Sequence, residues 1–303
     1  MRGNPHNLGD PVPRKFLAVL SSPDAKPFAN GSGRLEFADT LVQTPIFTRV
    51  IVNRVWKWHF GTGIVNTPDD FGVRGDPPSN PELLEYLSAE FQKEGMSLKK
   101  LQREIMLSAV YQQSDVESPE AHEKDAANRF YSHFGRQRMD AETLRDSVLF
   151  ASGDLNLKDV SGPSTDFAPD NTRRTVFCKV SRFRLNQYLE VFDFPNPGFS
   201  ADQRFSSNVP LQRLYFMNDA FIYSQAGKLT DRVYPQSTDE ARIKQLYLIL
   251  LSRQPTEKEL NLGETFVKTT PEKPGYTVDG EPVTAWKEYA RILLSSNEFE
   301  FIN

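Results

Sequence analysis

The sequence predicts a mainly α-helical protein: an irregular multi-helix domain with long loops, an extended N-terminal arm and at most a short β element near residues 174–180. Two observations support this prediction. Several segments carry apolar residues three and four positions apart, the spacing of helices that bury one face. Residues that start and stop helices bracket those segments, with Pro in the first turn and Gly after the last turn.

Composition narrows the classes of protein that fit. The chain has 303 residues and a formal net charge of −4, which disfavours a nucleic-acid binder. Its longest apolar runs, such as LYLILL at residues 246–251, are far shorter than a membrane span. Cys178 is the only cysteine, so the chain has no internal disulfide and no Cys-based zinc site.

The first 43 residues predict an extended arm, because they are rich in Pro, Gly, Asn and Ser. One short helix is expected within the arm, near residues 35–41. The opening MRGNPHNLGDPVPRKF lacks the features of a signal peptide. We expect the chain to be a segment of a longer protein.

The first long helix is predicted to begin at Pro45, with Thr44 as its cap, and to end at Gly61. Its apolar residues recur at helical spacing and predict one buried stripe, formed by Phe47, Val50, Ile51, Val55 and Trp58. The aromatic run WKWHF fits either a ligand-stacking platform or core packing, and the stripe favours the core.

Further helices are predicted by the same signals. One follows Asn80, one follows Ser97, and one runs from Asp140 to Gly153. After a loop at 156–172, RTVFCKV is the short strand candidate, and helices resume over 184–194, 209–233, 239–253, 257–268 and 283–299. We therefore predict an arm (1–43) and a single helical domain (44–303), with 44–155 and 173–303 as candidate subdomains.

The loop after the first long helix carries the first polar cluster, in which Gly63, Gly72 and Gly75 can take positive φ. Its candidate functional residues are His59, Asp69, Asp70, Arg74 and Asp76. An acid–base or cation site is one interpretation, although the loop lacks the spacing of an EF-hand. In the structural alternative, Asp69 or Asp70 closes a turn, and Arg74 binds a carboxylate or loop carbonyls.

A second polar cluster lies in HFGRQRMDAETLRD, and its candidates are Arg136, Arg138, Asp140, Glu142, Arg145 and Asp146. Glu142, Arg145 and Asp146 are three and four residues apart, so they share one helix face. Paired carboxylates held by arginines suit an enzyme. A buried salt-bridge network between helices would give the same pattern.

The secondary candidates are Asp193, Arg204, Asn208 and Asn218. Ser206 and Ser207 lie nearby without the GxSxG context of a nucleophilic serine. The sequence contains no P-loop, GxGxxG or HExxH motif, and no metal site is predicted. It therefore names no reaction by itself.

Long motifs resemble one bacterial family, the planctomycete-specific domain (PSD) family, also called domain of unknown function 1553. They include NRVWKWHFGTGIV, PDDFGVRGDPPSNPELLEYLSAEF, SLKKLQREIMLSAVYQQS, FRLNQYLEVFDFPNP and LLSSNEFEFIN. The resemblance spans nearly the whole chain, in order. Its strongest motif positions are His59, Phe60, Gly61, Asp70, Phe71, Gly72, Gly75, Pro78, Pro81, Asn297 and Phe299.

This resemblance implies a C-terminal module of a large exported protein, located in the periplasm or outside the cell. Its implied partners are upstream domains, among them a planctomycete-type cytochrome c domain. This chain has no CxxCH, so no haem or other cofactor is expected within it. The family supplies no established catalytic residues to transfer.

Two functions remain open at this point. The first is a non-catalytic module that docks or positions an upstream domain, as the family context and the absent catalytic motifs indicate. The alternative is an enzyme or binding domain for an extracellular ligand, anionic or carbohydrate, that uses the Asp, Arg and His residues of the polar clusters. This alternative requires the two main clusters to converge in the fold.

Overall fold

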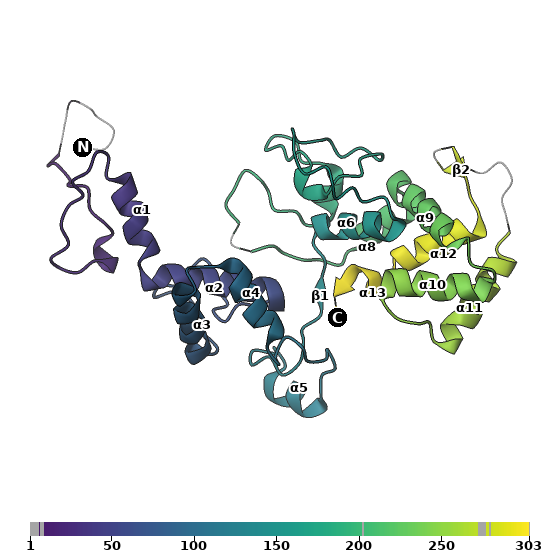
Figure 1. The fold of residues 1–303 in the computed structure, drawn as a ribbon, viewed down its shortest axis with the longest axis horizontal. Helices are drawn as coiled ribbons and strands as arrows, with labels where there is room; N and C mark the ends of the chain where they lie inside the picture. The colour runs from purple at the N-terminus through teal and green to yellow at the C-terminus, as the bar shows by residue number, and fades with distance from the viewer. Residues whose placement is uncertain (1–5, 7–8, 202, 272–276, 279, 303) are drawn as a thin grey trace. The chain divides into compact units, whose positions relative to one another are not determined.

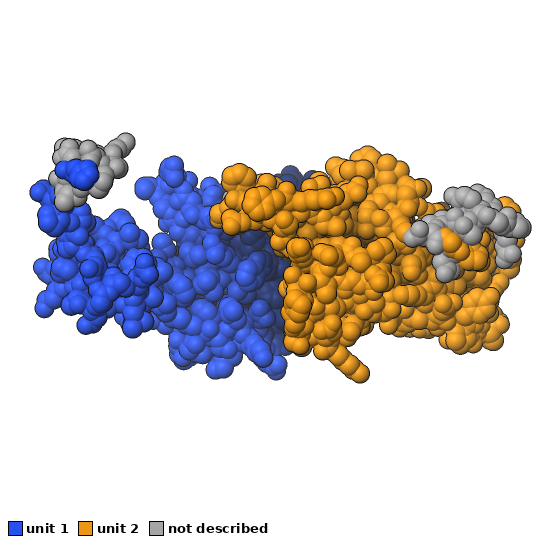
Figure 2. Space-filling model, turned by 90° about the horizontal axis from the view of Figure 1, so that it is seen from above, with its two compact units in different colours: residues 1–135 blue, residues 136–303 orange. Residues whose placement is uncertain are grey.

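The fold of the chain was obtained as a computed structural model that describes residues 6, 9–201, 203–271, 277–278 and 280–302. Among these residues it contains thirteen α-helices joined by long loops, so the mainly helical prediction is confirmed (Figure 1). The chain divides into two compact units, Met1–Gly135 (unit 1) and Arg136–Asn303 (unit 2), coloured separately in Figure 2.

Unit 1 consists of the N-terminal arm, then α2 with α3 and α4 packed against it, and then α5 (Figure 1). The short helix expected in the arm is present as α1, whereas residues 1–5 and 7–8 lie outside the described residues. The elements of unit 1 are η1 (Ala18–Leu20), α1 (Arg34–Val42), α2 (Pro45–Phe60), α3 (Pro81–Lys93), α4 (Leu98–Leu107) and α5 (Pro119–Asp125).

The predicted helix ends follow the local chemistry of their sequences. Helix α2 has Pro45 in its first turn and ends at Gly61, whose φ of 77° disfavours any residue with a side chain. Asn80 caps α3, because its side chain accepts a hydrogen bond from the Leu83 amide at 3.0 Å. These helix ends are confirmed, although the Thr44 side chain makes no cap hydrogen bond to α2.

The buried stripe of α2 differs from the predicted one. Trp58 is exposed, whereas Val52, Trp56 and Phe60, four residues apart, face the core together with Val55. The Trp56 and Phe60 rings stack with centroids 4.2 Å apart. Both stripes have helical spacing, so periodicity alone could not show which one faces α3 and α4.

Unit 2 contains more helices than unit 1. The prediction of one long helix over 209–233 is wrong. The chain forms α8 and α9 there, because Asp219 is extended and its carboxylate caps α9 by accepting the Phe221 amide at 2.9 Å. The helices of unit 2 are α6 (Ala141–Ser152), η2 (Thr175–Phe177), α7 (Gln187–Val191), α8 (Pro210–Asn218), α9 (Ala220–Val233), α10 (Asp239–Leu251), α11 (Glu257–Thr269), α12 (Ala285–Leu294) and α13 (Asn297–Glu300).

Short strands lie where the sequence pattern did not predict them. Strand β1 (Gln137–Arg138) pairs antiparallel with β4 (Phe301–Ile302), and β2 (Thr277–Val278) pairs with β3 (Glu281–Pro282). Near residues 174–180 the β element is a single bridge between Thr165 and Cys178, beside the 3-10 helix η2. Strands of two residues are too short to show a period of two.

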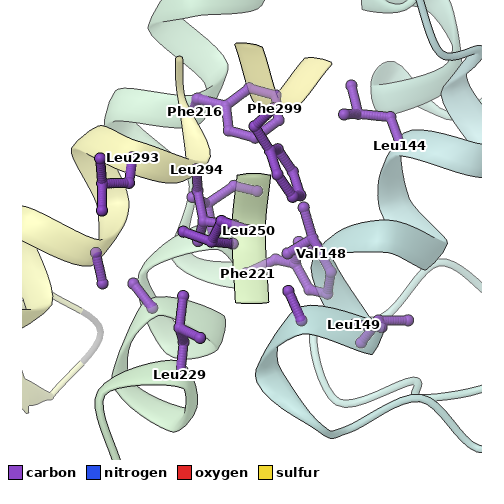
Figure 3. Packing of buried hydrophobic residues seen from close by; sticks show 14 of the residues in the cluster. Leu144, Val148, Leu149, Phe216, Phe221, Leu229, Leu250, Leu293, Leu294 and Phe299 are labelled. Carbon is purple, nitrogen blue, oxygen red and sulfur yellow. The ribbon is translucent and has the colours of Figure 1, made fainter. Parts of the chain in front are cut away.

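The core of unit 2 joins side chains from seven helices, α6, α7, α8, α9, α10, α12 and α13, and Figure 3 shows part of it. Fully buried leucines are among them, and each contributes about 1.5–3 kcal/mol by leaving water. Three examples are Leu144, Leu229 and Leu294. In the part of the chain that the structure describes, no helix is both long and apolar enough to cross a membrane.

Candidate functional site

The loop of residues 61–80 in unit 1, which carries the first polar cluster, is attached to α2 by a neutral side chain. Asn53 is fully buried, and its Nδ2 donates to the Val65 carbonyl at 2.9 Å. Its Oδ1 accepts from the Val65 amide at 2.8 Å. Asn53 thus satisfies both backbone groups of one buried loop residue, as a neighbouring strand would.

Gly63 and Gly75 of the 61–80 loop serve close backbone approach and not positive φ. Gly63, Gly72 and Gly75 all lie outside the left-handed region, so that expectation is wrong. A Cβ on Gly63 would lie 2.5 Å from the Val65 carbonyl oxygen. A Cβ on Gly75 would lie 2.0 Å from the Asp70 carbonyl oxygen, so the loop cannot close this tightly with a larger residue.

The central charged residues of the loop make local contacts. Asp70 Oδ1 accepts from the Gly72 amide at 2.9 Å, which forms a turn closed by the carboxylate. Arg74 Nε lies 3.8 Å from Asp70 Oδ2, but the Arg74 side chain is 92% exposed. Such a pair contributes little to stability.

The outer aspartates of the loop also have partners within unit 1. Asp69 Oδ1 accepts from Arg54 Nη2 at 2.8 Å, and both side chains are partly exposed. Asp76 Oδ2 lies 3.4 Å from Asn66 Nδ2. The Thr67 hydroxyl joins the two ends of the turn: it donates to the Asp70 carbonyl and accepts from the Asp76 amide, both at 2.9 Å.

His59 lies near the end of α2, half-buried against an aromatic ring. Its imidazole meets Tyr111 edge to face, with centroids 5.4 Å apart. Burial lowers the pKa of His59 from its ordinary value. The lowered pKa favours the neutral imidazole.

In unit 2, Arg138 is the centre of a cluster of five residues, which we name the Arg138 cluster: Arg138, Asp193, Ser207, Gln212 and Glu300. Arg138 Nη2 donates to Glu300 Oε2 at 2.8 Å, and the two side chains are only 4% and 2% exposed. Arg138 Nη1 donates to Gln212 Oε1 at 2.7 Å and to the Ser207 carbonyl. The guanidinium also lies over the Phe192 ring, 5.7 Å from its centroid.

Asp193 completes this cluster from the other side. Its Oδ2 accepts from the Ser207 amide at 2.8 Å and from Gln212 Nε2 at 3.2 Å. The Ser207 hydroxyl donates to the same carboxylate. The secondary candidate Asp193 therefore belongs with Arg138 in one structural network.

The carboxylates at the start of α6 bind Arg204, another secondary candidate. Arg204 donates to both oxygens of Glu142, at 2.6 and 2.8 Å, and lies 3.3 Å from Asp140. The hydrogen bonds to Glu142 raise the pKa of Arg204. Asp140 also caps α6 by accepting the Thr143 amide at 2.8 Å.

Arg145 and Asp146 turn toward the segment that precedes and includes η2. Arg145 is buried and donates to the carbonyls of Arg173, at 3.2 Å, and Asn171. Its guanidinium also lies 5.1 Å from the centroid of the Phe221 ring. Asp146 Oδ1 accepts from the Thr175 amide and hydroxyl, each at 2.7 Å. Both residues therefore order one segment of the loop.

The remaining candidates lie apart from these contacts. Arg136 is placed over the Phe301 ring, 5.5 Å from its centroid. Asn208 is exposed before α8. Asn218 is exposed at the end of α8, where its Nδ2 donates to the Leu214 carbonyl at 2.9 Å. The fold thus divides the predicted second and third groups into several small sets.

Arg173 is an organising residue that the sequence interpretation missed. It is buried and donates to three loop carbonyls, those of Asp159 at 3.3 Å, Ser161 at 2.9 Å and Pro163 at 3.0 Å. Its guanidinium lies 4.9 Å from the centroid of the Phe177 ring. An Arg inside a loop rich in Pro, Gly and Ser was the available signal, since such a loop needs donors for its carbonyls.

Most of the charged candidates in both units hold backbone groups or pair with one another. Among the described residues, no group of three His, Cys, Asp or Glu side chains is placed to hold a metal ion. A shallow hollow of about 410 Å³ lies on α11, lined by Glu257, Lys258, Asn261, Leu262 and Thr265. None of these lining residues is among the predicted candidates.

The first polar cluster lies in unit 1, and the second and third groups lie in unit 2. The convergence of the two main clusters, which the enzyme or binding-domain alternative requires, stays a prediction.

Comparison with known families identifies the chain. A family model described as PSD1, protein of unknown function (DUF1553), matches residues 33–267, from the start of α1 into α11. Comparisons with curated proteins and with solved structures give no match. Because the family model covers more than half of the sequence, the chain belongs to the PSD1 (DUF1553) family of proteins of unknown function.

Proposed function

We propose that this chain is a helical interaction module that docks onto another polypeptide and has no catalysis of its own. The observation that carries the proposal is an exposed apolar stripe on α8. Leu211, Leu214 and Met217 are 56%, 50% and 48% exposed. They recur every third residue and so lie along one side of the helix.

The opposite side of α8 is fixed in the core of unit 2. Gln212 belongs to the Arg138 cluster, and Phe216 is fully buried among the helices shown in Figure 3. The stripe is therefore presented by a rigid element. Exposed apolar side chains that lie next to one another are typical of surfaces that bind other proteins.

The contacts of the charged candidates support the same choice. Glu142 accepts from both Nη atoms of Arg204, and Asp193 accepts from Ser207 and Gln212. Asp70 closes a turn by binding the Gly72 amide. These contacts are typical of structural residues.

The proposed partner is an upstream domain of the full-length protein, including a c-type cytochrome domain. Location in the periplasm or outside the cell belongs to the same proposal. In this proposal the haem is carried by the partner, and this chain supplies only the surface.

The test uses isothermal titration of this chain with the separately produced upstream segment of its full-length protein. We expect binding in the micromolar range, as is usual for contacts between domains. Leu214→Glu should weaken it at least tenfold, because the substitution places a charge in the apolar contact. Leu262→Glu is the matched control, since Leu262 is a similarly exposed leucine on α11 (61%).

Two results would contradict the proposal. One is the absence of binding heat at tens of micromolar of both proteins. The other is equal binding by wild type and Leu214→Glu, both shown to be folded by circular dichroism. Turnover of a substrate by the isolated chain would overturn the non-catalytic part.

A further inference from the structure

A basic and aromatic turn is exposed on unit 2, between η2 and α7. It consists of residues 179–184, KVSRFR, which we name the 179–184 turn. Phe183 is fully exposed, and Val180 is exposed as well. The three basic side chains, Lys179, Arg182 and Arg184, also face solvent. None of these residues belongs to the polar clusters or to the apolar stripe on α8.

The three basic side chains of the 179–184 turn are not used by the fold. Within the part of the chain that the structure describes, they form no ion pair and no side-chain hydrogen bond. The two arginines that precede the turn differ, because Arg173 binds loop carbonyls and Arg174 pairs with Asp146. No acidic residue lies between Asp170 and Glu190 in the sequence. The turn is therefore locally positive on a chain whose formal net charge is −4.

The fold holds the backbone of this turn at its start, middle and end. The Lys179 amide donates to the Thr165 carbonyl at 2.8 Å. Ser181 Oγ accepts from the backbone amides two and three residues further on, at 3.3 and 3.4 Å, which closes a turn through the serine side chain. Leu185, the next residue, packs against the core of unit 2. The Phe183 ring is therefore presented by an ordered backbone, which lowers the entropy cost of binding.

The charge and the exposure of the turn together favour an anionic lipid surface as its partner. A protein partner would need a pocket that matches the Phe183 ring, whereas the interface of a bilayer accepts aromatic rings at the level of its headgroups. Guanidinium groups on either side of the ring match the geometry of lipid phosphates. Charges further than about 8–10 Å away are screened in physiological salt. The local positive charge therefore governs contact with a bilayer more than the net negative charge does.

We propose that the 179–184 turn docks the chain onto an anionic lipid bilayer. Phe183 and Val180 enter the interface, Arg182 and Arg184 bind the phosphates of anionic lipids, and Lys179 adds to the attraction. In peripheral binding of this kind, apolar burial and electrostatic attraction act together. One ring and three basic residues give weak, reversible binding. This surface goes beyond the docking function of α8 and does not depend on it.

The experiment measures co-sedimentation of the full chain with vesicles. One set contains phosphatidylcholine and phosphatidylglycerol, and the other contains phosphatidylcholine alone. We expect binding to the anionic vesicles only, and its loss at about 1 M salt, where charges are screened beyond about 3 Å. The double variant Arg182→Gln/Arg184→Gln should weaken binding roughly 25-fold, because each basic residue near the surface contributes a factor of about five. Circular dichroism checks that each variant is folded.

Phe183→Ala tests the aromatic part of the contact and should weaken binding at least about fivefold, because the ring no longer leaves water. Phe150→Ala is the matched control, since Phe150 is 67% exposed on α6 and residues 147–154 contain no Lys or Arg. Equal weakening in the two variants would overturn the assignment. In Phe183→Trp, lipids brominated in their acyl chains should quench fluorescence more than in wild type. Equal quenching would overturn insertion of the ring.

Other results would also overturn the proposal. Equal binding to both sets of vesicles would remove the role of charge, and no binding to the anionic set would remove the lipid. Loss of vesicle binding in Leu214→Glu would place the contact on α8, whereas retention keeps this proposal separate from the docking function. The turn would belong to another class of partner if an acidic protein or an oligonucleotide bound wild type but not Arg182→Gln/Arg184→Gln, with no binding to vesicles.

Discussion

The 61–80 loop of unit 1 and the Arg138 cluster of unit 2 have similar residues in opposite surroundings. In the loop, the charged groups lie at the surface. The side chain that holds the loop, the neutral Asn53 of α2, is fully buried. In the Arg138 cluster, the charged pair Arg138–Glu300 is itself buried. The number of charged residues in a stretch of sequence therefore does not show which of them stabilise the fold. Burial decides, because water screens the exposed pairs and cannot reach the buried ones.

The first prediction tests the buried pair Arg138–Glu300. Glu300→Gln keeps the shape of the side chain and removes its charge, so Arg138 is left as a buried cation without a charged partner. We expect the free energy of unfolding to fall by about 3–5 kcal/mol, measured by urea denaturation.

Glu142→Gln is the matched control for that substitution. Glu142 also pairs with an arginine, Arg204, but that arginine is exposed. We expect a loss of about 0.2–1 kcal/mol. Equal losses for the two variants would mean that burial does not set the contribution of these pairs.

The second prediction tests the neutral residue that holds the loop. Asn53→Ala leaves the amide and carbonyl of Val65 buried without partners, which we expect to cost about 2–4 kcal/mol in urea denaturation. Asn66→Ala is the control, because Asn66 is exposed and makes one long contact of 3.4 Å. A control variant as unstable as Asn53→Ala would contradict the assignment.

Arg253 gives an intermediate case between buried and exposed charge, and it predicts a dependence on pH. This half-buried side chain donates two hydrogen bonds to Glu259, at 2.8 and 2.9 Å, and two to Glu298. The hydrogen bonds from Arg253 lower the pKa of Glu259 to about 2 from its ordinary 4.5. Stability from this carboxylate is therefore present above the ordinary pKa and is lost as the pH falls through about 2.

We expect Glu259→Gln to lose about 1–2 kcal/mol at neutral pH, since solvent screens this pair in part. The difference in free energy of unfolding between Glu259→Gln and wild type should vanish once the pH falls below about 2. Gln can still close the capping box with Thr256 through its amide oxygen, so the substitution removes the charge and one of the two hydrogen bonds from Arg253. A difference that does not change with pH would mean that the substitution acts through packing.

The sequence predicts features whose causes are local and misses those whose causes are distant. Pro45, Asn80 and Asp140 mark helix starts, because each acts on residues within one turn. The pairing of Glu300 with Arg138 joins residues 162 positions apart, so no local pattern reports it.

The polar clusters show the same division. The charged candidates were recognisable from their spacing, but their partners were not. Thr67 and Gln212, two neutral residues, link charged candidates in the structure. The close approach at Gly75 depends on the path of the whole loop, so its backbone conformation was predicted incorrectly.

The smallest expected effect is at Asp70, among the exposed charged residues of the 61–80 loop. In Asp70→Asn the side-chain oxygen can still accept from the Gly72 amide, and only the attraction to the exposed Arg74 is lost. We expect a change of about 0–0.5 kcal/mol in urea denaturation. Because the fold stays intact, the same variant tests the catalytic alternative: loss of binding to sulfated or neutral oligosaccharides at unchanged stability would assign Asp70 to a ligand site. A loss of stability as large as that of Asn53→Ala would instead show that charge holds this loop, and the contrast between the two regions would fail.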